Sequence, residues 1–208
     1  MQAIELATHG PVIPVITLQR LDDALPLARA LLAGGVRVLE LTLRTPVALQ
    51  AMRAIARELP DVIVGAGTLR SPDDARAALD AGCRFAVSPG YRADIGRVCA
   101  DIGLPLLPGV ATASEVMAAT ADGYQFLKFF PAEAAGGVAV LDALAGPFAD
   151  VRFCPTGGIT PQSAPRYLAL PNVAVCGGSW LTPRAAVEAQ DWSRITALAR
   201  AAAALRAA

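Results

Sequence analysis

Short apolar runs recur along the whole chain, and longer segments with a helical alternation of apolar and polar residues separate them. Each run has the length of a buried strand, and from the second run onward the runs end about 20 to 27 residues apart. One βα unit needs about this length, so the spacing predicts a repeated supersecondary unit. The predicted strands are Val12–Ile16, Val38–Leu43, Val62–Ala66, Phe85–Ser88, Leu106–Gly109, Gln125–Phe129, Arg152–Thr156 and Val173–Gly177.

Signals for helix starts and stops lie between the predicted strands. The segment Ser71-Pro72-Asp73-Asp74 puts proline at the first helical position, and Thr112-Ala-Ser-Glu115 matches a capping box. Gly82 and Gly123 suit the C-terminal ends of helices, where glycine readily adopts a left-handed conformation. The alanine-rich segment Leu198–Ala208 predicts a closing helix.

Eight βα units, with no linker or charge block between them, predict one α/β domain over residues 1–208. We expect a compact (β/α)8 TIM barrel with an N-terminal lead and a C-terminal helix. An open doubly wound sheet is the alternative, but the Gly-x-Gly-x-x-Gly turn usual after its first strand is missing from the sequence. In a barrel, residues at the carboxyl ends of the strands form the active site.

The composition argues against several classes of partner. Of the 208 residues, 54% are hydrophobic, but no apolar run reaches the roughly 18 residues of a membrane span. The formal net charge is zero, so no basic field favours nucleic acid or an anionic membrane. Met1-Gln-Ala-Ile-Glu5 lacks the basic and apolar regions of a secretion signal, so we expect a cytoplasmic protein.

Metal and thiol chemistry find little support in the sequence. Cys83, Cys99, Cys154 and Cys176 form no Cys-x-x-Cys pair and lie in or near apolar segments, as small buried hydrophobes do in a reducing cytosol. His9 is the only histidine and precedes the first strand, so we expect it at the surface or at a cap. We therefore expect no metal site, no Ser-His-Asp triad and no cofactor.

The chain has seventeen arginines but one lysine, Lys128, which lies in the apolar run Tyr124-Gln-Phe-Leu-Lys-Phe-Phe-Pro131. Removing an unpaired cation from water costs several kcal/mol. Arginine stays protonated, whereas a desolvated lysine can lose its proton and act as a nucleophile. A preference for arginine at the surface would explain why lysine is rare. It would not explain the position of Lys128, so we interpret this lysine as a reactive amine.

Glu40 and Arg44 end the second predicted strand on one face, because side chains alternate along a strand. The intervening leucines would pack against helices, so the charged residues would point into the barrel mouth. A buried Glu40–Arg44 ion pair is the structural alternative. Thr68, after the third strand, offers a hydroxyl beside Gly65 and Gly67, which allow close approach of the backbone.

Matching Gly-Gly pairs follow the last two predicted strands, at Gly157-Gly158 and Gly177-Gly178. This is where barrels of this kind often bind phosphate, through free backbone N–H groups and a helix N-terminus. A reactive lysine, a carboxylate, an arginine and a phosphate site suit a substrate with a carbonyl, a carboxylate and a phosphate. The lysine would form a Schiff base, and the imine would draw electrons from a breaking carbon–carbon bond.

These segments together resemble the class I 2-keto-3-deoxy-6-phosphogluconate (KDPG) aldolase and 4-hydroxy-2-oxoglutarate (KHG) aldolase family. The resemblance runs in order from Pro11 to the final helix. The segments that carry it are Glu40-Leu-Thr-Leu-Arg44-Thr, Gly65-Ala-Gly67-Thr68, Lys128-Phe-Phe-Pro131-Ala-Glu, Arg152-Phe-Cys-Pro-Thr156-Gly-Gly158 and Gly177-Gly-Ser179-Trp180.

The resemblance implies a role for each matching residue, and it also implies a homotrimer and a place in the Entner–Doudoroff pathway. Lys128 would be the Schiff-base lysine and Glu40 the proton-transfer residue. Arg44, Thr68 and Thr156 would lie at the pyruvate-derived part of the substrate. The phosphate ligands would be Gly157, Gly158, Gly178 and Ser179, and Pro89 and Phe130 would line the pocket.

Three other functions remain open. A sister aldolase would prefer the galactonate epimer or unphosphorylated 4-hydroxy-2-oxoglutarate, although the Gly-Gly turns argue against a purely unphosphorylated substrate. A pyridoxal-phosphate enzyme also needs a Schiff-base lysine and a phosphate site, and its absorbance would reveal the cofactor. A non-catalytic barrel would bind a sugar phosphate without forming an adduct on Lys128.

Overall fold

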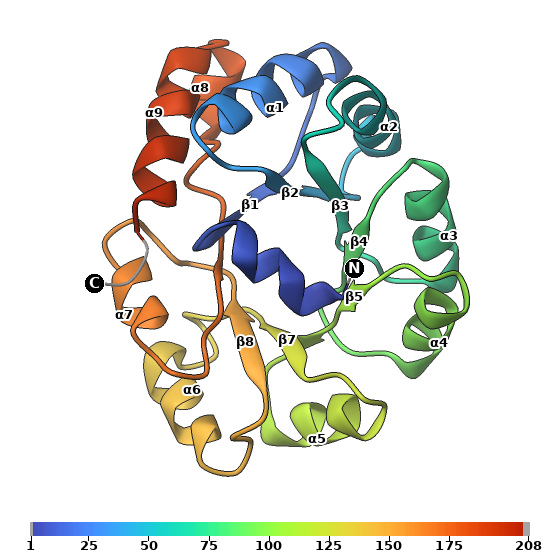
Figure 1. Ribbon diagram of the computed structural model, residues 1–208, viewed down its shortest axis with the longest axis vertical. Helices are drawn as coiled ribbons and strands as arrows, with labels where there is room; N and C mark the ends of the chain where they lie inside the picture. Colours follow the sequence, from blue (N-terminus) through green and yellow to red (C-terminus); the bar gives the residue numbers. More distant parts are fainter. Residues whose placement is uncertain (1, 206–208) are drawn as a thin grey trace.

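The computed structural model describes residues 2–205, in which parallel strands form the centre of the molecule and helices surround them (Figure 1). The six-stranded sheet has the order β5-β4-β3-β2-β1-β9, and a second sheet has the order β6-β7-β8. The strands are β1 (Val12–Ile16), β2 (Val38–Thr42), β3 (Ile63–Gly67), β4 (Phe85–Val87), β5 (Leu106–Leu107), β6 (Gly109–Val110), β7 (Phe126–Phe129), β8 (Arg152–Pro155) and β9 (Cys176–Gly178).

A helix follows most strands, as the spacing predicts, and packs on the outside of the sheets (Figure 1). From β1 to β5 the strands lie beside each other in chain order. A doubly wound sheet would reverse its order in the middle, so that alternative is wrong. The helices are α1 (Ala24–Ala33), α2 (Ala48–Glu58), α3 (Pro72–Asp80), α4 (Ala93–Asp101), α5 (Ala113–Ala121), α6 (Gly137–Ala145), α7 (Ala164–Leu168), α8 (Arg184–Glu188) and α9 (Trp192–Ala203).

Two predicted strands differ from the observed ones by more than one residue at an end. The fifth, Leu106–Gly109, is divided at Pro108 into β5 and β6, because proline has no N–H to donate to a ladder. The eighth was predicted to begin at Val173, but this residue makes only an isolated bridge to Phe153, and β9 begins at Cys176.

The closing helix begins earlier than its predicted start at Leu198. Asp191 caps α9 by accepting a hydrogen bond from the backbone N–H of Arg194, so the helix starts at Trp192. Residues 206–208 of the predicted helix lie outside the described residues. The sequence-based boundary was wrong because the alanine-rich tail has no start signal, whereas Asp191 does.

The N-terminal lead forms a 3₁₀ helix, η1 (Ala3–His9), which crosses the centre of the ring of strands in Figure 1. Its Leu6 is buried in an inner apolar cluster with Ile13, Val38 and Phe85 from three strands. A second, larger set of apolar contacts joins the outer faces of the strands to the helices. The lead therefore covers the amino ends of the strands and leaves their carboxyl ends for function.

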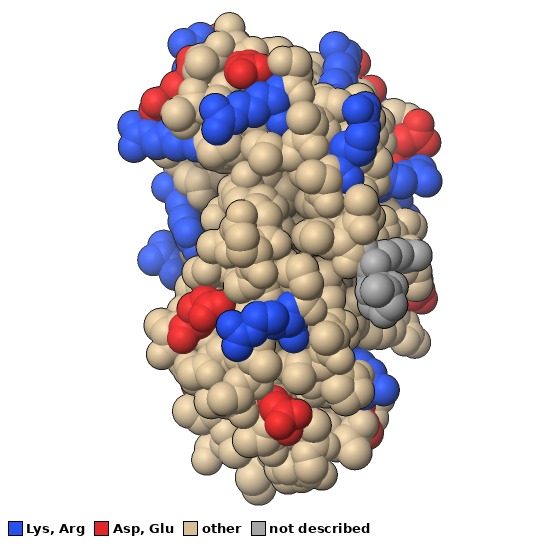
Figure 2. All heavy atoms as spheres, turned by 90° about the vertical axis from the view of Figure 1, so that its left-hand side faces the viewer, with Lys and Arg blue, Asp and Glu red and all other residues tan. Residues whose placement is uncertain are grey.

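The face that carries the C-terminal helices has much of its middle free of charged side chains (Figure 2). Charged groups gather above and below this area, with acidic and basic residues interspersed. Among the described helices, none is both long and apolar enough to cross a membrane.

Candidate active site

The centre of the site is a buried ion pair between β7 and β2. Lys128 Nζ donates a hydrogen bond to Glu40 Oε1 over 3.0 Å. The two side chains are 5% and 4% exposed, so water screens their attraction very little. The ammonium also lies 5.4 Å from the centroid of the Phe130 ring. The predicted meeting of lysine and carboxylate is present, whereas the alternative Glu40–Arg44 pair is absent among the ion pairs of the described residues.

Alternation along β2 turns Glu40 inward. Leu39 and Leu41 face the outer core, whereas Val38 belongs to the inner cluster. The carboxylate also needs the neighbouring strand to carry glycine, because a Cβ at Gly67 would lie 2.3 Å from Glu40 Oε1. The glycine pattern at the end of β3 is therefore part of how the carboxylate is positioned.

Arg44 and Thr68 come together just beyond the ends of β2 and β3. Arg44 Nε donates a hydrogen bond to Thr68 Oγ1 over 3.0 Å. The guanidinium is exposed, and no ion pair in the described part of the chain uses it. A cation fixed at one nitrogen and free at the others can receive a carboxylate at the mouth of the site.

Thr156 lies at the end of β8, two residues beyond Cys154, which is the register partner of Lys128. Its hydroxyl donates to the carbonyl of Cys154 over 3.3 Å and lies 3.9 Å from Cys154 Sγ. Burial raises the pKa of the Cys154 thiol to about 12, partly opposed by Lys128, so this neighbour of the lysine stays uncharged. All four cysteines are free and buried, which confirms the prediction that they are small buried residues.

The two Gly-Gly turns are neighbours, because Thr156 and Gly177 form a parallel bridge. Gly157 and Gly158 both have left-handed backbones, with φ values of 106° and 79°. Within residues 2–205, no acceptor takes a hydrogen bond from the N–H group of either glycine. The helices that follow begin only at Ala164 and Arg184, so loop N–H groups rather than a helix N-terminus would contact an anion here.

The remaining predicted residues lie on neighbouring loops. Pro89 and Phe130 are half-buried, two residues beyond β4 and one residue beyond β7, while Ser179 is exposed after β9. Gly178 is buried, and a Cβ there would lie 2.0 Å from the Trp180 ring. Apart from the contact between Lys128 Nζ and the Phe130 ring, no hydrogen bond or ring contact in the described chain joins these residues to Lys128, so the fold places them at the same edge.

Sequence reasoning overlooked Ser88, which it treated only as the end of the fourth predicted strand. Ser88 is 1% exposed at the end of β4, and its Oγ has no partner among the described residues. Buried hydroxyls normally have a hydrogen-bond partner, so this group is available to a ligand or water. Its position as the polar last residue of a predicted strand was the signal that could have identified it.

A cavity of about 680 Å³ lies at the other end of the strands, beside η1. Its lining includes Ile4, Leu104, Tyr124 and Arg152, and none of the residues predicted for the site. Its size is therefore no argument about the chemistry at Lys128. Within the described residues, no group of three or more His, Cys, Asp or Glu side chains is placed to hold a metal ion.

Parallel strands that hold a buried lysine against a carboxylate, beside a pair of glycine turns, define the class of Schiff-base enzymes with an anion site. Residues 4–198 match the family model described as KDPG and KHG aldolase. The chain belongs to this family.

Relatives of known name agree with that assignment. The KHG/KDPG aldolase of Escherichia coli strain K12 is 52% identical over 95% of this chain and 93% of its own. The 2-dehydro-3-deoxy-phosphogluconate aldolase of Dickeya dadantii has the same identity and coverage. A crystal structure of KDPG aldolase from Legionella pneumophila, with pyruvate captured as a covalent carbinolamine, is 47% identical, covers 98% of both chains and superposes with a TM-score of 0.96.

Proposed function

We propose that the protein is a class I aldolase that cleaves KDPG to pyruvate and glyceraldehyde 3-phosphate in the Entner–Doudoroff pathway. The observation that carries the proposal is the buried 3.0 Å contact between Lys128 Nζ and Glu40 Oε1. The family and the names of the relatives at 52% identity support the same activity.

Lys128 and Glu40 perform the covalent step together. Transfer of a proton from Lys128 to Glu40 leaves a neutral amine, which attacks the C2 ketone of the substrate. The resulting carbinolamine hydroxyl leaves as water with the proton that Glu40 received, and a protonated imine remains. The carbinolamine captured in the Legionella pneumophila enzyme supports this route.

Cleavage of the C3–C4 bond then needs a single base, and Glu40 is placed to act as that base. Glu40 removes the proton from the C4 hydroxyl, the C3–C4 bond breaks, and its electron pair forms an enamine as the imine nitrogen becomes neutral. Glyceraldehyde 3-phosphate leaves. Glu40 returns the proton to C3, and water hydrolyses the pyruvate imine to regenerate Lys128. The carboxylate is within reach of both events because it lies against the lysine that holds the substrate.

The rest of the site binds the two ends of the substrate. Arg44 and Thr68 hold the carboxylate, with Thr156 beside the pyruvate carbons. The phosphate is held by the N–H groups of Gly157, Gly158, Gly178 and Ser179, and Pro89 and Phe130 form walls of the pocket. The left-handed glycines with unused N–H groups support the phosphate assignment.

A second substrate, 4-hydroxy-2-oxoglutarate, is favoured by the family description and by the name of the Escherichia coli relative. It has the same ketone, carboxylate and C4 hydroxyl, so the same lysine and carboxylate would cleave it. It lacks the phosphate, and we therefore expect a higher KM for it than for KDPG.

The two sheets, we propose, close into one (β/α)8 barrel that forms a single domain over residues 1–208. β5 continues through Pro108 into β6, and the bridges Phe153↔Val173 and Thr156↔Gly177 link β8 to the last strand region.

The protein acts in the cytoplasm as a homotrimer. The area without charged side chains in the middle of the face shown in Figure 2 is a candidate contact face between subunits. A solution mass that differs from three chains of 21.4 kDa would refute the trimer.

Reductive trapping tests the central claim. The protein is treated with pyruvate and borohydride, and intact mass followed by peptide analysis locates the adduct. We expect a pyruvate-dependent reduced adduct on Lys128, the only lysine. An adduct confined to the amino terminus, or none, would leave a barrel that binds phosphate without imine chemistry.

The variants Lys128→Arg and Glu40→Gln separate the two roles. Lys128→Arg should form no adduct and have no activity, since a guanidinium stays protonated. Glu40→Gln should slow turnover by roughly 10²–10⁴-fold while trapping remains detectable. An unchanged rate in Glu40→Gln would move proton transfer to another group.

A further inference from the structure

Thr68 has a backbone conformation that its residue type disfavours. Its φ is 65°, in the left-handed region, where β-branched residues are outliers. Among the described non-glycine residues, only Gln190 shares a positive φ. This conformation places Thr68 Oγ1 at 3.0 Å from Arg44 Nε. A strained conformation persists only where the surroundings hold it, so the groups that hold Thr68 also determine where Arg44 lies.

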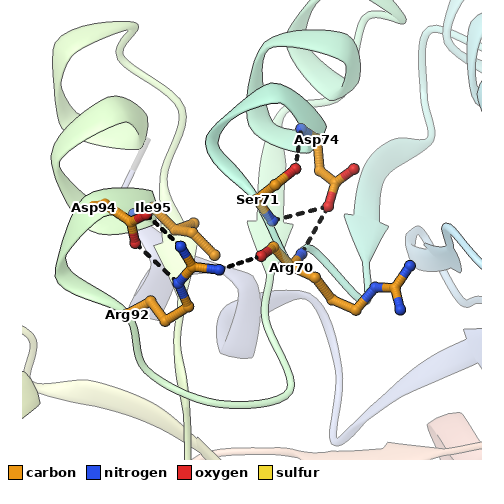
Figure 3. Close-up of polar contacts among 6 residues, drawn as sticks. All are labelled: Arg70, Ser71, Asp74, Arg92, Asp94 and Ile95. Atoms are coloured by element: carbon orange, nitrogen blue, oxygen red, sulfur yellow. Dashed lines mark hydrogen bonds and ion pairs between the residues drawn. The ribbon is translucent and has the colours of Figure 1, made fainter.

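The residues directly after Thr68 have their backbones fixed one after another. The N–H of Leu69 donates to the carbonyl of Val87 on β4 over 3.1 Å. The N–H groups of Arg70 and Ser71 both donate to Asp74 Oδ2, over 2.7 and 3.0 Å (Figure 3). Asp74 therefore does more than complete the capping box of α3, because it also holds a residue outside the helix.

Arg92 fixes the same segment from the next loop. Its Nη1 donates to the carbonyl of Arg70 over 2.8 Å, while its Nε and Nη2 are held by Asp94 (Figure 3). The side chain of Arg70 points away from this contact in Figure 3, so the bond is to the backbone alone. Arg92 thus ties the loop after β3 to the start of α4.

We propose that Asp74 and Arg92 are positioning residues for substrate binding, acting through Thr68. They hold the loop that keeps the Thr68 hydroxyl against Arg44, and so they orient the guanidinium toward the substrate carboxylate. Neither residue contacts the reacting atoms. The inference rests on the proposed function, which gives Arg44 its carboxylate.

Steady-state kinetics of Asp74→Ala and Arg92→Met test the proposal with KDPG as substrate. We expect KM to rise about tenfold in each, the loss of roughly one charge-assisted hydrogen bond, while kcat changes less than twofold. Asp74→Asn keeps an acceptor oxygen and should recover most of the affinity. The matched controls are Asp73→Ala and Arg76→Met, because these residues form a solvent-exposed pair on the same helix and should leave KM unchanged.

The Thr68→Gly background separates positioning from general stability. Glycine adopts the left-handed conformation without strain and removes the hydroxyl, so Arg92→Met should raise KM no further in that background. A tenfold rise that persists in Thr68→Gly, or an unchanged KM in both single variants, would overturn the proposal. Borohydride trapping of the wild type distinguishes failure of the proposed function from failure of the positioning role. If pyruvate is not trapped, the proposed function is refuted. If pyruvate is trapped but Asp74→Ala and Arg92→Met keep the wild-type KM, only the positioning role is refuted. If Asp74→Ala does not fold, Arg92→Met, at a surface residue, decides alone.

Discussion

At the scale of single residues, the Lys128–Glu40 pair bears on stability as well as on the proposed chemistry. Both side chains are almost fully buried, so neither can exchange its partner for water. Removing one member of such a pair leaves an uncompensated buried charge. Replacing both members by uncharged groups often leaves the free energy of unfolding nearly unchanged. The pair is therefore a place where activity and stability respond differently to the same substitutions.

The ion pair gives a prediction for stability. Lys128→Met should lower the free energy of unfolding by about 3–5 kcal/mol, because Glu40 stays buried without a partner. The double variant Lys128→Met/Glu40→Gln should regain most of that loss and remain inactive. Urea denaturation followed by circular dichroism measures both. As a control, Arg76→Met breaks an exposed ion pair and should change the free energy of unfolding by less than about 1 kcal/mol. If Lys128→Met/Glu40→Gln were destabilised by the sum of the two single losses, the expectation would be contradicted.

At the scale of elements, the helix starts that carry a capping box were the most predictable features and the contacts between loops the least. The capping boxes at Ser71 and Thr112 are both formed as their residue types predict. The division of the fifth strand was missed although Pro108 signals it, whereas the bond from Arg92 to the Arg70 carbonyl was not predictable. Local patterns determine a cap, whereas a contact between two loops depends on how whole strands pack.

The capping box of α5 should make part of the stability depend on pH. Burial alone would raise the pKa of Glu115, but hydrogen bonds from the Ala111 and Thr112 N–H groups and the Thr112 hydroxyl outweigh it and hold the pKa below its ordinary value. The charged form is therefore favoured by folding. The charged Glu115 carboxylate contributes fully to the free energy of unfolding above its ordinary pKa, near 4.3. This contribution is lost as the pH falls through the lower pKa of the carboxyl in the folded protein.

Melting temperatures of the wild type and Glu115→Gln between pH 3 and pH 7 measure this dependence. The wild type should melt higher at pH 7, and the difference should shrink as the solution becomes acidic, because glutamine accepts the same bonds without titrating. A difference that is constant over this range, or that grows on acidification, would show that the carboxylate charge contributes nothing.

At the scale of the whole molecule, the two ends of the strands have separate roles. The amino ends are covered by η1 and its Leu6, whereas the proposed catalytic groups gather at the carboxyl ends. The sequence predicted this polarity well, because polar residues follow the predicted strands at regular intervals. It did not predict that the lead would cover the inner cluster, since seven residues without a strong period give little indication of where they pack.

This division predicts that stability can be lost without loss of catalysis. Leu6→Ala should lower the free energy of unfolding by about 2–5 kcal/mol, since Leu6 is 1% exposed. The kcat/KM of the folded fraction should stay within about twofold of the wild type. Leu79→Ala, at a position 39% exposed, is the matched control and should change stability by less than about 0.5 kcal/mol. A large fall in kcat/KM of Leu6→Ala would mean that the two ends are coupled.

The single buried lysine also makes the folded chain an unusual object for bioconjugation. Acylating dyes and cross-linkers that attack primary amines meet one lysine, and it is enclosed at 5% exposure. The native protein should therefore accept one label, at its amino terminus, without any engineering of the sequence. Because a small keto acid must reach Lys128 in the folded protein, protection of Lys128 by pyruvate from a small amine reagent would measure access to the catalytic centre, whereas a bulky dye found on Lys128 would report that the interior had opened.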